Sequence, residues 1–138
     1  MTQMIAVKHN VEMAHRLSQT PGKCENIHGH SWNVTLKLLG DVDETGKVVE
    51  FGEVKKQFRG YLDSEFDHRL LLWDSDPILM GRPDYDLFWP GLKYFETDPT
   101  TENFAAHLLH WSMETFNMKS EIEVWETAVN MARAGGPW

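Results

Sequence analysis

Apolar and polar positions alternate along two stretches of the chain, the pattern of a β-strand with one buried face. In MIAVKHNVEMAH, residues 4–15, the apolar parity comprises Ile5, Val7, His9, Val11, Met13 and His15. In HGHSWNVTLKLLG, residues 28–40, it comprises His28, His30, Trp32, Val34, Leu36 and Leu38. The turn-forming stretch DVDETGK separates this second strand from VVEF, residues 48–51. We therefore expect VVEF to begin a return strand and to form an antiparallel hairpin.

After Glu50 the apolar period becomes that of an amphipathic helix. Its stripe is formed by Phe51, Val54, Phe58, Tyr61 and Leu62. A second helix is predicted within DPTTENFAAHLLHWSMETF, residues 98–116, with Asp98 or Thr100 as the N-cap. We interpret SEFDHRLLLW, residues 64–73, as a loop or short turn, and residues 74–98 as a long irregular segment. EIEVWETAV, residues 121–129, alternates again and predicts the last strand.

This order of elements predicts an α+β fold, in which an antiparallel sheet of four strands carries two helices on one face. The 138 residues suit a single domain spanning residues 1–138. A net charge of -8 argues against a nucleic-acid surface. The single cysteine forms no internal disulfide, which predicts a reduced, cytoplasmic protein. No apolar run reaches the length of a membrane span, and the N-terminus lacks the apolar core of a signal peptide.

Three histidines share the apolar parity of the predicted strands. Residues two apart on a strand point the same way, so His28 and His30 direct their imidazoles to one side. A neighbouring strand can add His15, and three neutral imidazoles with an open fourth position are typical of catalytic zinc. The alternative is that these histidines are ordinary strand residues without a ligand.

Cys24, in the stretch CENIHGH, has three possible roles. It is a fourth zinc ligand, a base or nucleophile beside the metal, or a small buried apolar residue. The spacing to His28 does not separate these roles.

Three further groups are candidates for chemistry. Asp67 followed by His68 offers a carboxylate beside an imidazole, which suits acid–base work, although adjacent side chains on regular structure diverge. Glu102 falls in the first turn of the predicted helix, where acids stabilise the helix end. Glu126 follows a strand-like run and has no such structural explanation.

Six motifs in this order make the chain similar to the 6-pyruvoyltetrahydropterin synthase / 6-carboxytetrahydropterin synthase family. They are MAHRL, CENIHGH, GKVVEFGEVK, FDHRLL, PTTEN and VWET. The resemblance implies that Zn²⁺ is bound by His15, His28 and His30. It implies a catalytic group of Cys24, Asp67 and His68. It also implies a pterin site that is anchored by Glu126 and includes Thr100, Thr101 and Glu102.

The resemblance further implies the tunnelling fold, whose protomers form rings, here a homotrimer or homohexamer with active sites between subunits. The short spacing from Cys24 to His28 looks like the bacterial carboxy branch. That branch converts 7,8-dihydroneopterin triphosphate to 6-carboxy-5,6,7,8-tetrahydropterin, releases triphosphate and acetaldehyde, and feeds queuosine-type deazapurine synthesis. Lys23 and Arg16 are candidate triphosphate contacts.

Three other functions stay open at this point: 6-pyruvoyltetrahydropterin synthesis by triphosphate elimination alone, a non-catalytic zinc scaffold, and a pterin-binding module without metal. The chain departs from the family pattern at Glu50, where an aspartate is usual, and in residues 74–98, a segment longer than in compact members.

Overall fold

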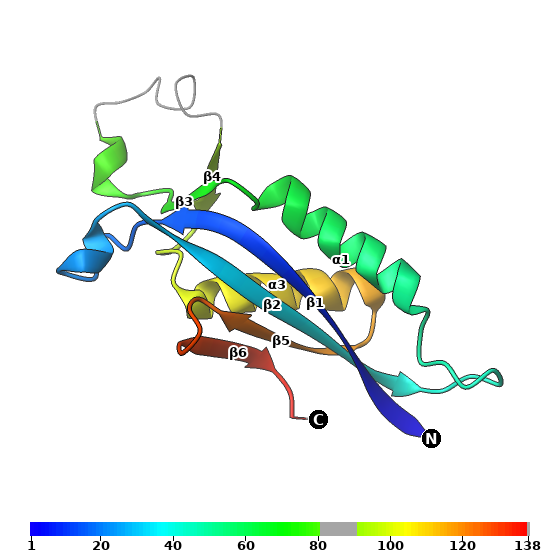
Figure 1. Ribbon diagram of the computed structural model, residues 1–138. Coiled ribbons are helices and arrows are strands. Elements are labelled where there is room, and N and C mark those ends of the chain that lie inside the picture. The colour runs from blue at the N-terminus through cyan, green and yellow to red at the C-terminus, as the bar shows by residue number, and fades with distance from the viewer. Residues whose placement is uncertain (81–90, 138) are drawn as a thin grey trace.

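A mixed β-sheet of six strands, with two helices on one face, forms the described part of the protein (Figure 1). The computed structural model describes residues 1–80 and 91–137. The sheet order is β4-β3-β1-β2-β5-β6. The strands are β1 (Thr2–His15), β2 (His28–Asp41), β3 (Leu70–Trp73), β4 (Leu92–Phe95), β5 (Lys119–Trp125) and β6 (Met131–Gly135). The helices are α1 (Phe51–Glu65) and α3 (Thr101–Phe116), and two 3-10 turns are η1 (Lys23–Glu25) and η2 (Pro77–Leu79).

The long hairpin of β1 and β2 is the centre of the sheet. Antiparallel pairing places Val11 opposite Trp32 and His9 opposite Val34. Directly opposed residues project on the same face, so the two alternating patterns of the sequence meet in one apolar layer. Val11, Trp32 and Val34 are all fully buried in it. The alternation predicted for both strands is confirmed.

Both helices cover this apolar layer, and within residues 1–80 and 91–137 no helix lies on the opposite sheet face. α1 contributes Val54, Phe58 and Leu62, and α3 contributes Phe104 and Leu108, to a single buried cluster with the strands. The stacked rings of Tyr61 and Trp111, 4.3 Å apart, join the two helices to each other. The predicted helical stripes are confirmed except at Phe51, whose side chain at the start of α1 is 48% exposed.

The expected return strand at Val48 is wrong, because residues 48–49 form a bend and α1 begins at Phe51 after its N-cap Glu50. The preceding turn is closed on Asp43, whose Oδ1 accepts hydrogen bonds from Thr45 and Lys47. β2 pairs instead with the earlier strand β1, so the hairpin loop is residues 16–27.

The expected sheet of four antiparallel strands is also wrong. LLLW, which we interpreted as part of a loop, is strand β3, and it pairs in parallel with β1 through Ala14 and His15. β4 then pairs in parallel with β3, and β6 pairs antiparallel with β5 at the opposite edge. The three leucines of β3 are buried, so the strand shows no alternation by which the sequence could have revealed it.

The segment 74–98 is irregular only in part. It contains η2 and strand β4, and its residues 81–90 lie outside the described residues. Among the described helices, none has the length and apolar character needed to cross a membrane.

Candidate active site

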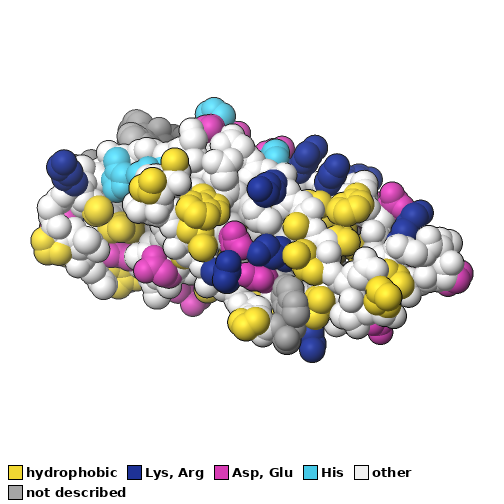
Figure 2. Space-filling model, turned by 60° about the horizontal axis from the view of Figure 1, so that its bottom comes forward, with side chains coloured by type: hydrophobic (Ala, Val, Ile, Leu, Met, Phe, Trp, Pro, Cys, Tyr) yellow, Lys and Arg dark blue, Asp and Glu magenta, His cyan; other side chains and the backbone are white. Residues whose placement is uncertain are grey.

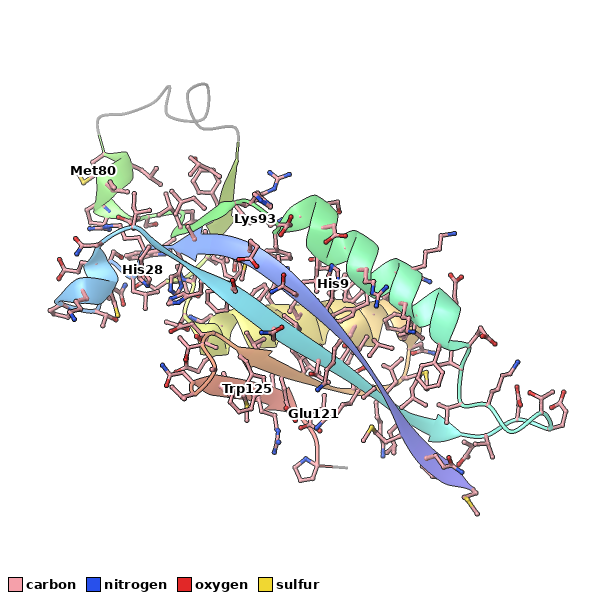
Figure 3. The ribbon with its side chains drawn as sticks, viewed as in Figure 1. His9, His28, Met80, Lys93, Glu121 and Trp125 are labelled. Carbon is pink, nitrogen blue, oxygen red and sulfur yellow. The ribbon has the colours of Figure 1, made fainter. Side chains whose placement is uncertain are left out.

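The three predicted metal histidines meet at one end of the β1–β2 hairpin. His15 lies directly opposite His28 in the ladder, and His30 follows two residues later on the same face. One nitrogen from each ring lies within 4.8 Å of those of the other two. Figure 3 labels His28 at this end of the hairpin, and histidine side chains reach the surface there in Figure 2.

Hydrogen bonds set the orientation of two of these rings. Nδ1 of His15 lies 2.8 Å from the carbonyl oxygen of Pro99, and Nδ1 of His28 lies 2.7 Å from that of Asn26. A carbonyl only accepts, so each Nδ1 is the donor and each Nε2 is the nitrogen left to face the cluster. This is the usual arrangement of a metal-binding histidine, whose second nitrogen donates to a carbonyl.

Two of the inward nitrogens have no hydrogen-bond partner among the described residues. Nε2 of His15 and Nε2 of His30 are buried and make no hydrogen bond. Burial, as the largest cause, lowers the pKa of both His15 and His30, so both are neutral at pH 7. Unpaired lone pairs on neutral imidazoles suit a divalent cation. These three residues are the one group of at least three metal-ligating side chains found in the described ranges.

Glu126, directly after β5, lies beside this cluster. Its Oε1 is 3.6 Å from Nε2 of His30, and its Oε2 is 3.8 Å from Nε2 of His15. Oε2 also accepts a hydrogen bond of 2.7 Å from the hydroxyl of Thr101. A carboxylate is thus held next to the candidate metal position by the first residue of α3.

An open groove of about 390 Å³ runs from Glu126 over the start of α3 and along β6. It brings together three of the four predicted substrate residues, and its lining is Thr101, Glu102, Glu126, Asn130, Met131, Ala132 and Arg133. Sequence reasoning missed the β6 residues of this groove. In MARAG only Met131 and Arg133 have large side chains, and the other three residues are Ala or Gly. The alternation is therefore too weak to predict a strand.

Thr100, the fourth predicted substrate residue, does not line this groove. It is the N-cap of α3, and its hydroxyl accepts a hydrogen bond from the backbone N–H of Asn103. The predicted cap is therefore confirmed at Thr100, and Asp98 lies two residues before it. Glu102 is exposed in the first turn, as expected from its stabilisation of the helix end.

Cys24 lies in η1, within the loop between the two histidine strands, and is partly exposed. Its sulfur does not belong to the metal-ligating group that the described residues form. Lys23 precedes it in the same turn. Arg16, the other candidate cation, forms an ion pair with the fully buried carboxylate of Asp76, so its charge is already neutralised.

Asp67 and His68 do contact each other, which regular structure would prevent. His68 has φ 62, a left-handed conformation, and its Nδ1 lies 2.6 Å from Oδ2 of Asp67. The backbone N–H of Glu12 donates to Asp67 and is the largest cause of its lowered pKa. The carboxylate is therefore ionised and orients the exposed His68 ring. Within the described residues, no hydrogen bond or ion pair connects this pair to the histidine cluster.

Comparison with known proteins identifies the family. The family model described as 6-pyruvoyl tetrahydropterin synthase matches residues 4–137. The chain belongs to the 6-pyruvoyl tetrahydropterin synthase family. The family is one of tetrahydropterin synthases, which confirms the resemblance drawn from the six motifs.

Relatives within the 6-pyruvoyl tetrahydropterin synthase family agree with this assignment. The 6-carboxy-5,6,7,8-tetrahydropterin synthase of Rickettsia bellii is 32% identical over 108 residues, which are 76% of this chain and 78% of that protein. Two crystal structures share the fold. An uncharacterized protein, WS1659 from Wolinella succinogenes, has a TM-score of 0.84 at 19% identity and 99% coverage of both chains. The 6-pyruvoyl tetrahydropterin synthase of Plasmodium vivax has a TM-score of 0.79 at 21% identity and 97% coverage of both chains.

Proposed function

We propose that this protein is a zinc-dependent 6-carboxy-5,6,7,8-tetrahydropterin synthase that acts on 7,8-dihydroneopterin triphosphate in queuosine-type deazapurine synthesis. The observation that carries the proposal is the pair of unpartnered buried nitrogens, on His15 and His30, beside the carboxylate of Glu126. In this proposal the metal would hold the side chain of the substrate, and the neighbouring carboxylate would hold its pterin ring.

Glu126 is the proposed anchor of the pterin ring. A pterin presents an amino group and a ring N–H as neighbouring donors, and one carboxylate can accept from both. The Thr101 hydroxyl donates to Oε2 and fixes the orientation of the carboxylate before substrate binds. The groove along β6 gives the ring a place to lie against Met131.

His15, His28 and His30 are the proposed zinc ligands. Zinc bound there would polarise the hydroxyl groups of the substrate side chain and lower their pKa. Cys24, as thiolate, is the proposed base that removes a proton from the side-chain carbon. His68, oriented by ionised Asp67, is the proposed carrier of the partner proton, and triphosphate leaves.

The dyad of Asp67 and His68 supports an assembled active site. The His68 side chain is 78% exposed, and no described contact joins it to the histidine cluster of its own protomer. An exposed, oriented imidazole is suited to act on substrate held by a neighbouring protomer. We therefore propose a homotrimer or homohexamer with active sites between subunits.

The carboxy branch is preferred to the pyruvoyl branch for two reasons. Rickettsial relatives above 30% identity carry the name 6-carboxy-5,6,7,8-tetrahydropterin synthase. The 6-pyruvoyl tetrahydrobiopterin synthase of Drosophila melanogaster is slightly less similar, at 29% identity over 126 residues. Analysis of the products distinguishes the two branches, because only the carboxy reaction releases acetaldehyde.

The test is mass analysis of the products formed from 7,8-dihydroneopterin triphosphate, together with zinc content. We expect 6-carboxy-5,6,7,8-tetrahydropterin and about one zinc per protomer.

Two variants test the roles of the site residues. Cys24→Ala should keep zinc, and its turnover should fall by a factor of roughly 10²–10⁴, as for a missing general base. His28→Ala should lose both. Retention of full zinc by His28→Ala would contradict the metal site, and loss of zinc by Cys24→Ala would make the thiol a ligand.

A further inference from the structure

We propose that Asp98 is a positioning residue that holds Cys24 in register with the histidine cluster, a role that rests on the proposed function of Cys24. The connection between His15 and His28, residues 16–27, is named the cysteine loop here. It contains no long regular element, only the three-residue turn η1. Something outside the loop must therefore hold its sulfur at a defined distance from the metal ligands.

The carboxylate of Asp98 makes that connection. Asp98 is only 7% exposed, and both its oxygens accept from the cysteine loop. Oδ1 accepts from the hydroxyl of Ser18 at 2.8 Å and from its backbone N–H at 3.2 Å. Oδ2 accepts from the backbone N–H of Gln19 at 2.9 Å. Three donors on one buried carboxylate fix the start of the loop more firmly than a neutral acceptor can.

The start of the loop is tied directly to Cys24. The backbone N–H of Leu17 donates to the carbonyl oxygen of Cys24 at 2.8 Å, which closes the loop across its base. Asp98 therefore acts on Ser18 and Gln19, and these residues act on Cys24 through the neighbouring Leu17. A chain of hydrogen bonds thus links the partly exposed cysteine to Asp98.

The segment that carries Asp98 also contacts the rest of the candidate site. The Pro99 carbonyl accepts from Nδ1 of His15, and the Thr101 hydroxyl donates to Glu126. The carbonyl of Asp98 itself accepts from the backbone N–H of Thr100 at 2.8 Å, which links the segment to the start of α3. The segment from Asp98 to Thr101 thus sets the relative positions of the thiol, a metal ligand and the substrate carboxylate.

The experiment compares Asp98→Asn with wild type and with Asp43→Asn. The amide introduced by Asp98→Asn would present an N–H₂ group to one of the N–H donors of the cysteine loop and break that hydrogen bond. Asp43 is a matched control, because its carboxylate also accepts from two backbone N–H groups and a hydroxyl, but in the turn after β2. Zinc content, kcat, KM and the rate of alkylation by iodoacetamide are measured for each. Cys24 is the only cysteine, so alkylation reports on it alone.

For Asp98→Asn we expect zinc content and KM to stay near wild type. We expect kcat to fall roughly tenfold to a hundredfold, the scale of a displacement of about 1 Å at a reacting group. Alkylation should accelerate roughly threefold to tenfold, because the released loop exposes the thiol more often. Asp43→Asn should match wild type in all four measurements. A purely structural role for Asp98 would lower thermal stability without this separation of kcat from KM.

An Asp98→Asn variant with the alkylation rate and kcat of the wild type would overturn the proposal. Loss of zinc with an unchanged alkylation rate would also overturn it, because Asp98 would then position His15 and not Cys24. If Asp98→Asn does not fold, Ser18→Ala removes one of the three donors and should accelerate alkylation by a smaller factor. Wild-type alkylation there would again contradict the role. Absence of turnover in the wild type would refute the proposed function alone, because alkylation and zinc content still decide the role of Asp98.

Discussion

Glu126 shows how a single residue acquires a functional environment that its sequence neighbours do not reveal. It follows Trp125 at the end of β5, yet its partners are Thr101 of α3 and two histidines of the central hairpin. Its oxygens face Nε2 of His15 and of His30, and both imidazoles are neutral at pH 7 in the metal-free protein. The carboxylate therefore forms no strong ion pair with them. This leaves it free to accept from a ligand.

Replacement of Glu126 by Gln tests this role, because the amide keeps the shape and exchanges one acceptor oxygen for a donor. We expect dihydroneopterin to bind more weakly by roughly 1–3 kcal/mol, since a buried pterin donor loses its partner. Zinc content should not change. Titration calorimetry measures the affinity of each form, with Glu114→Gln on the exposed side of α3 as the control. Equal affinities for Glu126→Gln and wild type would exclude the anchoring role.

The neutral histidines also make the metal-free protein sensitive to pH. Burial lowers the folded-state pKa of His15, His30 and His107 below the ordinary 6.5, so the unfolded chain binds more protons as pH falls past that value. The stability that these groups contribute is complete above about pH 6.5 and is lost as pH falls towards the lowered values. Carboxylates whose pKa is lowered change the stability only at more acid pH.

We therefore expect the melting temperature of the chelator-treated protein to fall between about pH 7.5 and pH 5.5. His15→Gln should reduce the slope without abolishing it, because His30 and His107 remain. Thermal unfolding at the two pH values measures the effect in both proteins. A melting temperature that rises on acidification of the wild type would contradict neutral burial of these rings.

At the scale of elements, the start of α3 both caps the helix and contacts residues of the candidate site. Its N-cap Thr100 satisfies the N–H of Asn103, while the neighbouring residues contact His15 and Glu126 through Pro99 and Thr101. The helix is held by the core through Phe104 and Leu108. A firmly seated helix therefore gives the site residues at its first turn a fixed base.

Thr100→Ala removes the capping acceptor and should lower the free energy of unfolding by about 1 kcal/mol. Thr97→Ala, at an exposed position of the preceding segment, is the control and should stay within about 0.5 kcal/mol of wild type. Denaturant unfolding at constant zinc measures both. An unchanged free energy for Thr100→Ala would mean that water replaces the hydroxyl without loss.

At the scale of the whole molecule, the sheet face opposite α1 and α3 is charged at its centre. Lys37 of β2 forms ion pairs with Glu121 and Glu123 of β5, and Arg133 of β6 forms ion pairs with the same two glutamates. Two positive and two negative charges thus form one network across these three strands. Acidic and basic side chains lie intermingled on the face seen in Figure 2. Both sheet edges, β4 and β6, are short strands that can pair with another chain.

We expect the protein to assemble into a ring, with a mass three or six times the 16.0 kDa of one chain. Light scattering at micromolar concentration measures this mass. The pairing of edge strands and the exposed His68 both favour assembly, since the dyad then gains a substrate to act on. A monomer under these conditions would contradict both the ring and the active site between subunits.

The sequence alone determined the features that depend on local periodicity. Alternation identified β1 and β2 and the face that carries His15, His28 and His30, because side chains on a strand repeat every two residues. The helical period identified α1 and α3, and capping chemistry placed the start of α3 at Asp98 or Thr100, of which the structure has Thr100. Equal parity made the histidine cluster a candidate, and the pairing of β1 with β2 in the folded protein brings the rings together.

The tertiary structure decided what depends on pairing between distant segments. β3 is buried on both faces and shows no alternation, and β6 has mostly small residues, so neither gave a periodic signal. The hairpin partner of β2 is set by apolar burial along the length of β1, a choice that no turn motif near Val48 could reveal. The contact of Asp67 with His68 needs a left-handed residue, and the hold of Asp98 on the cysteine loop joins positions 80 residues apart. Such contacts form only when the chain folds, because their energy comes from burial shared by segments that are remote in sequence.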